Sequence, residues 1–382
     1  QEINMKKTLA AVAVLGAFAG SALAADVQLY GLIDTGLRYV HSDADMTNKD
    51  ATDSFSMKSG MASGSRFGFK GTEDLGNGLT VGFVLENGFS SDDGAEAGVF
   101  FDRESSLFLQ GGFGKVAFGR MGSINNGTSS WGKYGMISAF GTSWGDYAAQ
   151  AGTWAMGAGL WDNMISYQTP TFAGVTVYAQ YGMGNAVKDY NSVENESSSD
   201  RYYALGATYA NGPLNLYLAV DSINYATYNG KGNTTSDVDD SLTVTLGGNF
   251  FEVVKLFAGA QYFDEIKLST MKGAVQLDSG TLAGKMEGWS LGVSASIPAA
   301  GGTVLVGAAY LDAEAAGSVT GDAKDDELNR WIVSAGYDYP FSKRTDVYGV
   351  VTYNQDQMDS KTAANDRDPS VYGVMVGLRH KF

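Results

Sequence analysis

The sequence has 382 residues, no Cys, 51 Gly and 5 Pro, and its 42 acidic against 26 basic residues give a net charge of −16. The lack of cysteine excludes a disulfide framework and thiol chemistry. Beyond the N-terminal segment no apolar run approaches the ~18 residues of a helical membrane span, which excludes a helical membrane protein.

The N-terminal segment has the three parts of a secretory signal peptide. Lys6-Lys7 precede an apolar stretch from Leu9 to Ala19, and Ala22-Leu23-Ala24 fits an A-x-A cleavage site. The apolar stretch is too short to span a membrane. We therefore predict that residues 1–24 are upstream residues plus a cleaved leader, and that residues 25–382 form one exported domain. A buried N-terminal helix is the alternative.

The rest of the chain alternates between apolar and polar residues, which places every second side chain on one face of a strand. In the first such segment Leu29, Ile33 and Leu37 share one face, while Asp34 and Arg38 share the other. The predicted strands are residues 27–38, 66–70, 79–86, 107–110, 116–118, 165–168, 175–181, 203–209, 214–220, 242–248, 254–262, 289–297, 304–310, 331–339, 347–353 and 372–382.

These segments number about sixteen, and bacterial outer-membrane barrels have an even number of strands. Short turns alternate with long polar loops, as in barrels with short periplasmic turns and long extracellular loops. The predicted long polar loops are residues 42–59, 120–162, 185–200, 226–240, 264–285, 313–327 and 354–368. A soluble β-sandwich, the alternative, has no reason to separate its loops by length. We predict an all-β fold, a transmembrane antiparallel β-barrel of about sixteen strands.

A closed barrel pairs every backbone amide without leaving a sheet edge, which the hydrocarbon region demands. At about sixteen strands the interior is too wide for side chains to fill. The predicted inward faces are polar, and unpaired polar groups are costly in a dry core. Aromatic residues at strand ends fit an interfacial girdle; they are Phe113, Phe172, Phe250, Phe251, Tyr337, Tyr339 and Phe341. The sequence therefore predicts a water-filled lumen.

Three motifs add a family resemblance. Gln28–Asp34 reads QLYGLID, Ser65–Gly78 reads SRFGFKGTEDLGNG, and Gly112-Phe113-Gly114 is followed by Phe118-Gly119-Arg120. Together with a C-terminal Phe382, these motifs resemble the general porins of Gram-negative bacteria, in particular their Neisseria-like, beta-proteobacterial branch. The resemblance implies an outer-membrane homotrimer of sixteen-stranded barrels, passive diffusion of ions and small hydrophilic solutes, no cofactor, and a third long loop folded into the lumen.

The interval from Arg120 to Asp162 matches that third loop. It lacks a strand pattern and contains four of the chain's six Trp. A structureless segment of about 40 residues in a compact fold is either functional or misassigned, and we interpret it as functional. Its aromatic residues either pack the loop against the wall or form a stacking track for sugars in a substrate-specific channel. They are Trp131, Tyr134, Phe140, Trp144, Tyr147, Trp154 and Trp161.

The resemblance also implies wall cations that face the constriction, with acidic partners on the loop. Arg66, Lys70 and Arg103 match the family's wall cations, Arg38 is lumenal by alternation, and Arg120 lies at the root of the loop. The candidate constriction residues are Arg38, Arg66, Lys70, Arg103, Arg120, Asp146 and Asp162. Each arginine could instead pair locally with Glu86, Glu104 or Asp102. The wall cations favour anions and the acidic loops pull the other way, so ion preference stays open.

Other chemistry finds little support. With His41 and His380 as the two histidines, a metal site or a Ser-His-Asp triad has few candidates, and an outer-membrane hydrolase is the main alternative of another class. An adhesin or structural barrel is a third. Asp43-Ala44-Asp45 and Asp237-Val238-Asp239 lack the Gly and terminal Glu of a calcium loop. No catalytic residue, metal or cofactor is expected.

The expected partners follow from the same resemblance. Divalent cations could bridge the acidic loops to lipopolysaccharide. The final strand, with Tyr372 and Phe382 as its C-terminal assembly signal, is expected to be read by the barrel-insertion machinery. No nucleic acid is expected.

Overall fold

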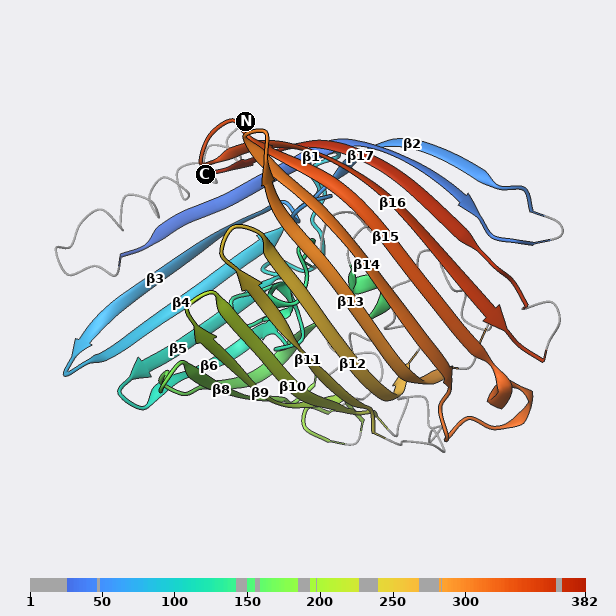
Figure 1. The fold of residues 1–382 in the computed structure, drawn as a ribbon. Coiled ribbons are helices and arrows are strands. Elements are labelled where there is room, and N and C mark those ends of the chain that lie inside the picture. Colours follow the sequence, from blue (N-terminus) through green and yellow to red (C-terminus); the bar gives the residue numbers. More distant parts are fainter. Residues whose placement is uncertain are drawn as a thin grey trace, which may run out of the picture.

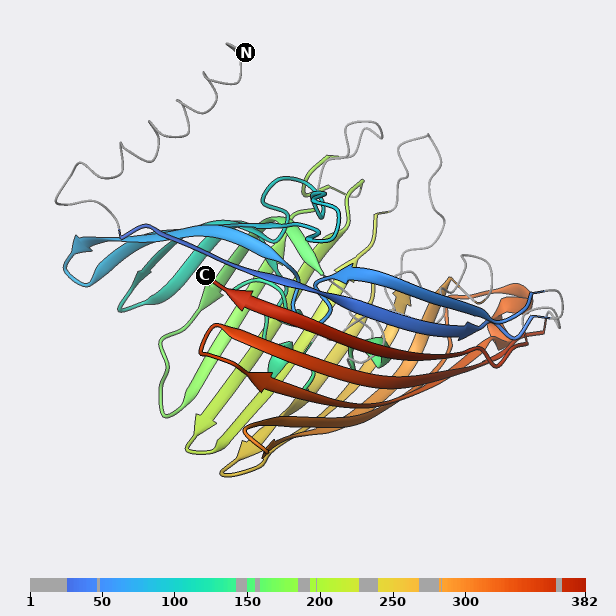
Figure 2. The ribbon, with the colours of Figure 1, turned by 90° about the horizontal axis from the view of Figure 1, so that it is seen from above.

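The computed structural model describes residues 26–46, 49–141, 150–154, 159–184, 193–196, 198–226, 240–267, 282, 284–361 and 366–382. The predicted leader lies outside these residues. The described chain forms one antiparallel sheet of 17 strands, in which β1 also pairs with β17. Figures 1 and 2 show the tilted strands closing into a barrel.

The strands are β1 (Gln28–Asp43), β2 (Thr52–Ser59), β3 (Arg66–Gly76), β4 (Leu79–Gly88), β5 (Glu104–Gly111), β6 (Gly114–Gly122), β7 (Leu160–Gln168), β8 (Val175–Gly182), β9 (Arg201–Asn211), β10 (Leu214–Asn224), β11 (Leu242–Phe251), β12 (Lys255–Lys267), β13 (Lys285–Ala299), β14 (Gly302–Ala315), β15 (Glu327–Pro340), β16 (Thr345–Asp359) and β17 (Ser370–Lys381). The short helical elements are the 3₁₀ turns η1 (Tyr134–Met136), η2 (Gln150–Thr153) and η5 (Gly321–Asp325). In the part of the chain that is described, no helix is long and apolar enough to cross a membrane.

β2 and β3 are two halves of one barrel strand. β1 pairs with β3 through Gln28–Leu32 and with β2 through Thr35–Ser42, so the two halves follow each other along the same edge of β1. Counted in this way, the sheet is a closed barrel of 16 strands, and the predicted fold class is confirmed.

The link between these halves turns into the barrel and is held by a buried carboxylate. One oxygen of Asp34 accepts hydrogen bonds from the backbone N–H groups of Ala62, at 2.9 Å, and Ser63, at 2.7 Å. The other oxygen accepts the hydroxyl of Tyr348 from β16, at 2.6 Å. Because Asp34 is fully buried, these donors replace the water that an ionised carboxylate otherwise needs.

The predicted loop over residues 42–59 is wrong. β1 continues to Asp43, and Thr52–Ser59 forms β2. The alternation that marks β2 rests on only two apolar residues, Phe55 and Met57, both of which are exposed. A short, mostly polar segment gives little periodic signal, although its backbone pairs with β1 throughout.

β12, β14 and β16 also extend into segments predicted as loops, because the polarity of the two faces inverts at their extracellular ends. Leu311, Ala313 and Met358 are buried on the inward face, whereas Asp312 and Glu314 alternate with them on the other. The inward residues form an apolar cluster with Leu282 from the loop between β12 and β13, and Val319 and Ala323 from the loop between β14 and β15 pack against it. Outside the membrane, water surrounds the outer face of these strands, so that face is polar. The apolar residues lie on the inner face, where loops cover them and keep them from water.

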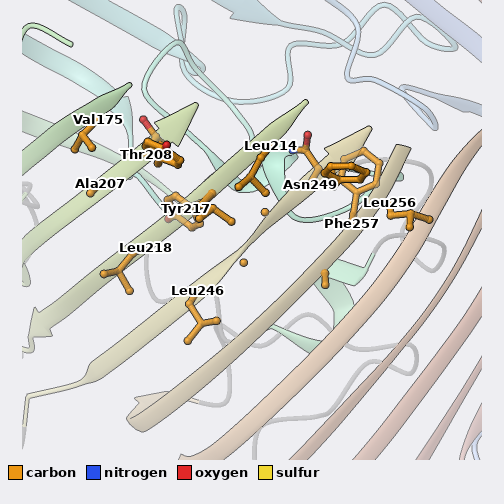
Figure 3. A pocket seen from close by; sticks show the side chains of 16 residues that line it. Val175, Ala207, Thr208, Leu214, Tyr217, Leu218, Leu246, Asn249, Leu256 and Phe257 are labelled. Carbon is orange, nitrogen blue, oxygen red and sulfur yellow. The ribbon is translucent and has the colours of Figure 1, made fainter. Parts of the chain in front are cut away.

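Along the middle of the strands the outward face is apolar, as expected for contact with hydrocarbon. Near the periplasmic ends of β8–β12 it carries an apolar groove of about 710 Å³, with Gly247 and Gly248 among its lining. Leu218 and Leu246 lie on one side of this groove, and Leu214 and Leu256 on the other (Figure 3).

Aromatic side chains gather at the short turns of the periplasmic end. Exposed examples are Phe113, Phe172, Phe250, Tyr339 and Phe341. Their level agrees with the predicted interfacial girdle.

The barrel closes at its C-terminal residue. The N–H of Phe382 donates to the carbonyl of Gly31 at 3.0 Å, and the N–H of Gly31 donates to the carbonyl of Phe382 at 3.1 Å. Gly31 has no room for a side chain, since a Cβ there would lie 2.4 Å from the ring of Phe382.

Deleting Phe382 should lower both the yield and the melting temperature of the folded barrel. The deletion removes two seam hydrogen bonds, worth about 1 kcal/mol each, and the ring that packs on Gly31. The heat-dependent shift in electrophoretic mobility measures folded barrel, and Phe382→Tyr, which keeps the backbone and the ring, is the control. Equal yield and melting temperature in the deletion variant would show that the seam does not depend on this residue.

Candidate functional site

The described parts of the segment between β6 and β7 lie inside the barrel (Figure 2), and glycines of the wall lie beneath them. A Cβ at Gly206 of β9 would lie 2.2 Å from the side chain of Ile124, and one at Gly307 of β14 would lie 3.2 Å from Phe140. Gly247 and Gly259, on β11 and β12, lie in the same way beneath Ile137 and Trp154. The missing side chains on the wall allow the segment to approach the strands directly.

Hydrogen bonds from wall side chains fix the backbone of this segment. Gln180 of β8 accepts the N–H of Ile124 at 2.7 Å. Asn249 of β11 donates to the carbonyl of Met136 at 2.9 Å. Ser294 of β13 accepts the N–H of Ala139 at 2.9 Å. Because buried backbone groups need such partners, the contacts hold the segment across β8–β13.

A buried ion pair anchors the far end of the segment. The guanidinium of Arg330 on β15 makes two hydrogen bonds to the carboxylate of Asp356 on β16, at 2.6 and 2.7 Å. A further N–H of Arg330 donates to the carbonyl of Gly152 in η2 at 2.7 Å. Both charged side chains are fully buried, so the pair is shielded from water and its geometry is fixed.

The aromatic residues of the segment that are described pack it in place. Trp131, Tyr134, Phe140 and Trp154 are all buried, and Tyr134 meets Trp154 edge to face at 5.9 Å. Trp161 stacks on Tyr202 of β9 at 5.3 Å. These contacts favour the packing interpretation over an open stacking track for sugars. Trp144 and Tyr147 lie outside the described residues.

A polar cavity of about 340 Å³ separates the segment from the opposite wall. Arg66 of β3 and Arg103, just before β5, line it from one wall, Lys255 lines it from β12, and Ser138–Gly141 line it from the segment itself. The cavity therefore brings wall cations together with the folded-in loop. Lys255 was missed by the sequence analysis, although its alternation with Phe257 places both on the inward face.

Arg66, Arg103 and Arg120 of the predicted set have carboxylate partners nearby. Arg103 contacts Glu86 at 2.6 Å, and Arg66 lies 3.6 Å from the same carboxylate. Arg120 contacts Asp162 at 2.6 Å. The local pairing considered for these arginines is thus present, with Glu86 shared by two of them.

The remaining predicted residues lie apart from these pairs. Lys70 is exposed and lies 5.2 Å over the ring of Tyr30. Arg38 pairs across the seam with Met375, whose side chain is buried, which agrees with an inward-facing position. Asp146 lies outside the described residues.

The residues considered for a hydrolase or a metal site are the two histidines and two short acidic segments. His41 lies 2.9 Å from Asp53 and stacks on Tyr372 at 4.8 Å. Within the described ranges no group of three or more His, Asp or Glu side chains could hold a metal ion. Asp237-Val238-Asp239 lies outside those ranges.

Comparison with known families and proteins agrees with this architecture. Residues 10–359 match the family described as Gram-negative porin. An outer membrane porin protein of Bordetella pertussis is 34% identical, with 99% of this chain and 100% of that protein aligned. Outer membrane porin protein 32 of Delftia acidovorans is 31% identical, and the major outer membrane protein P.IB of Neisseria meningitidis is 29% identical, each over the same shares.

Solved structures are similar as well. The anion-selective porin from Comamonas acidovorans superposes with a TM-score of 0.66 at 27% identity, covering 94% of this chain and 100% of that one. The outer membrane channel DcaP of Acinetobacter baumannii has a TM-score of 0.60 at 15% identity, covering 95% and 99%, a likeness of fold alone.

Replacing one member of the buried ion pair should destabilise the protein strongly, and replacing both should not. Arg330→Met leaves the Asp356 carboxylate buried without its cation, which typically costs about 3–5 kcal/mol. Adding Asp356→Leu removes that charge, and an apolar pair in place of a buried ion pair is often nearly neutral. Denaturant unfolding of both variants measures the difference. Equal loss of stability in the single and the double variant would contradict the buried-pair description.

Proposed function

The chain belongs to the Gram-negative porin family, and from this premise we propose that the segment between β6 and β7 forms the constriction of a general diffusion channel. As an outer-membrane porin the protein provides a water-filled channel for ions and small hydrophilic solutes. The proposal rests on how this segment is held. Hydrogen bonds fix the segment to strands from β8 to β15, and the segment borders the polar cavity lined by Arg66, Arg103 and Lys255.

The constriction acts by geometry and charge, without a chemical step. Water and solutes pass between the loop and the wall cations, and the width of that passage sets the size limit. The proposal includes no catalysis and no cofactor. The buried packing of Trp131 and Trp154 supports a general channel over one specific for sugars.

We further propose that the channel prefers anions. Arg66 and Arg103 together carry one positive charge more than Glu86, and Lys255 lines the same cavity. The anion-selective porin from Comamonas acidovorans, at 27% identity, supports the same sign. A narrow, partly dehydrated passage strengthens the effect of each charge, whereas charges on the acidic rim are screened beyond about 8 Å in physiological salt.

The proposed partners follow from the barrel and its surroundings. We propose a homotrimer, in line with the resemblance to the general porins. The acidic extracellular loops are proposed to bind divalent cations that bridge to lipopolysaccharide. Phe382, which completes the seam with Gly31, is proposed as the residue that the insertion machinery reads. The leader over residues 1–24 remains a prediction.

Shortening the segment Ser138–Met156 should raise the unit conductance of single channels, because it removes the part of the loop that narrows the lumen. The measurement is the conductance step in planar bilayers at fixed salt. Shortening the loop between β16 and β17 by deletion of residues 361–365 is the control, since no described residue of that loop is among those that line the cavity. An unchanged step in the Ser138–Met156 variant would remove this segment from the constriction.

Replacing Arg66 and Lys70 with Ala should shift ion preference toward cations. Loss of Arg66 leaves Glu86 and Arg103 as a neutral pair, and a single charge close to the ion path is worth about 1 kcal/mol or more, a several-fold change in permeability ratio. The reversal potential in a salt gradient measures that ratio. An unmoved reversal potential would show that these cations do not set the preference.

A further inference from the structure

The cations that face the lumen differ in whether a carboxylate neutralises them. Arg103 and Arg120 each contact a carboxylate at 2.6 Å, and Arg379 contacts Asp346 at 3.0 Å. Lys115 and Lys133 behave differently: among the described residues, no carboxylate lies within ion-pair distance of either ammonium group. Neither lysine belongs to the set predicted from the sequence.

Aromatic rings hold these two ammonium groups in place. The Nζ of Lys115 lies 4.0 Å from the ring centre of Phe108 and 5.0 Å from that of Trp131. The Nζ of Lys133 lies 5.0 Å from the ring centre of Tyr178. A cation–π contact positions an ammonium group without cancelling its charge. Both lysines therefore present a full positive charge while their side chains stay half-buried.

The two lysines lie close to each other. Lys133 follows Trp131 by two residues, and Lys115 contacts the ring of that tryptophan. Burial lowers the pKa of Lys133, and the nearby charge of Lys115 lowers it further. Two like charges at short range raise the local positive potential.

The carboxylate of Glu104 acts on the charge of Lys115, but it already accepts hydrogen bonds from other groups. Glu104 of β5 is buried, and it accepts the N–H and the hydroxyl of Ser130 at 2.8 and 2.9 Å and the hydroxyl of Ser106 at 2.8 Å. These bonds fix the start of the constriction segment to the wall. Glu104, Lys115 and Lys133 together carry one negative and two positive charges, so their summed charge is positive.

Lys115 reaches the arginine-lined cavity's surroundings from the periplasmic end of the wall, and Lys133 lies in the segment that borders this cavity. Lys115 directly follows Gly114 at the periplasmic start of β6, and Tyr178 lies in the periplasmic half of β8. Arg103 precedes β5, whose far end, Gly111, is the same periplasmic turn. At about 3.3 Å per residue, the backbones of Arg103 and Lys115 lie roughly 20 Å or more apart along the strand, whereas Lys133 lies two residues from Gly135, which lines the cavity.

We propose that Lys115 and Lys133 form a second anion-attracting station, on the periplasmic side of the constriction loop, for chloride and small oxyanions such as carboxylates and phosphate. The station deepens the proposed diffusion function and rests on it. Because acidic residues dominate the extracellular loops, a positive station at the periplasmic side gives the pore opposite charges at its two ends. Such asymmetry makes the current at low salt depend on the sign of the voltage.

The test compares the wild type with the double variant Lys115→Met and Lys133→Met in planar bilayers of known orientation. Met keeps the length of the side chain and removes the charge. Lys343→Met, in the exposed turn between β15 and β16, is the matched control. The double variant should show a several-fold lower anion-to-cation permeability ratio and a more symmetric current at low salt. At high salt its unit conductance should match that of the wild type, because screening removes the effect of charge.

A second variant guards against a merely structural role. Lys115→Arg with Lys133→Arg keeps both charges and lets the side chains still stack on the three rings, so it should retain the permeability ratio and the current asymmetry of the wild type. The station is overturned if the Met variant folds, conducts and keeps the permeability ratio and asymmetry of the wild type. The permeability ratio of the wild type tests the proposed anion preference separately. The station predicts that this ratio falls in the Met variant, whether the wild type prefers anions or cations.

Discussion

Everything in this structure depends on the closure of the sheet between β1 and β17. In hydrocarbon an unpaired backbone amide costs several kcal/mol, and the β1–β17 pairing from Leu32 to Asp43, completed by Phe382 on Gly31, leaves no such edge at the seam. Closure at this number of strands also fixes a lumen too wide for the wall's own side chains to fill. The barrel therefore needs an internal segment if its passage is to be narrow.

The wall is adapted to receive that segment. Glycines on β9, β11, β12 and β14 let Ile124, Ile137, Trp154 and Phe140 lie against bare backbone, and polar side chains between them take up the backbone groups of the segment. On the outside of the barrel, Gly247 and Gly248 are among the residues that line the apolar groove of Figure 3. The charged side chains that line the cavity are single residues on this wall and segment.

The sequence alone predicted the architecture wherever one face meets lipid and the other meets water. Leu29, Ile33 and Leu37 against Asp34 defined β1 correctly, since their alternation reflects two different solvents. The prediction failed for β2, which has only two apolar residues, and for the extracellular ends of β12, β14 and β16, where water surrounds the outer face and loops cover the inner one. Alternation there is short or inverted, so period alone could not reveal it.

The site was less predictable than the fold because its side-chain contacts join residues that are far apart in the sequence. Arg66, Arg103 and Arg120 were recognisable as candidates, and Glu86 and Asp162 were among the possible acidic residues, but which arginine meets which carboxylate is set by the register of neighbouring strands. Lys115 had an inward position, yet the rings of Phe108 and Trp131 that hold it come from another strand and from the loop. The anchor from Arg330 to Gly152 spans residues far apart in the chain.

The most direct test of the account is a recording of the purified wild-type protein in planar lipid bilayers. A water-filled lumen narrowed by a firmly anchored loop predicts stable conductance steps of uniform size that depend only weakly on voltage. Absence of steps at every protein concentration, with the barrel shown to be folded and inserted, would contradict it.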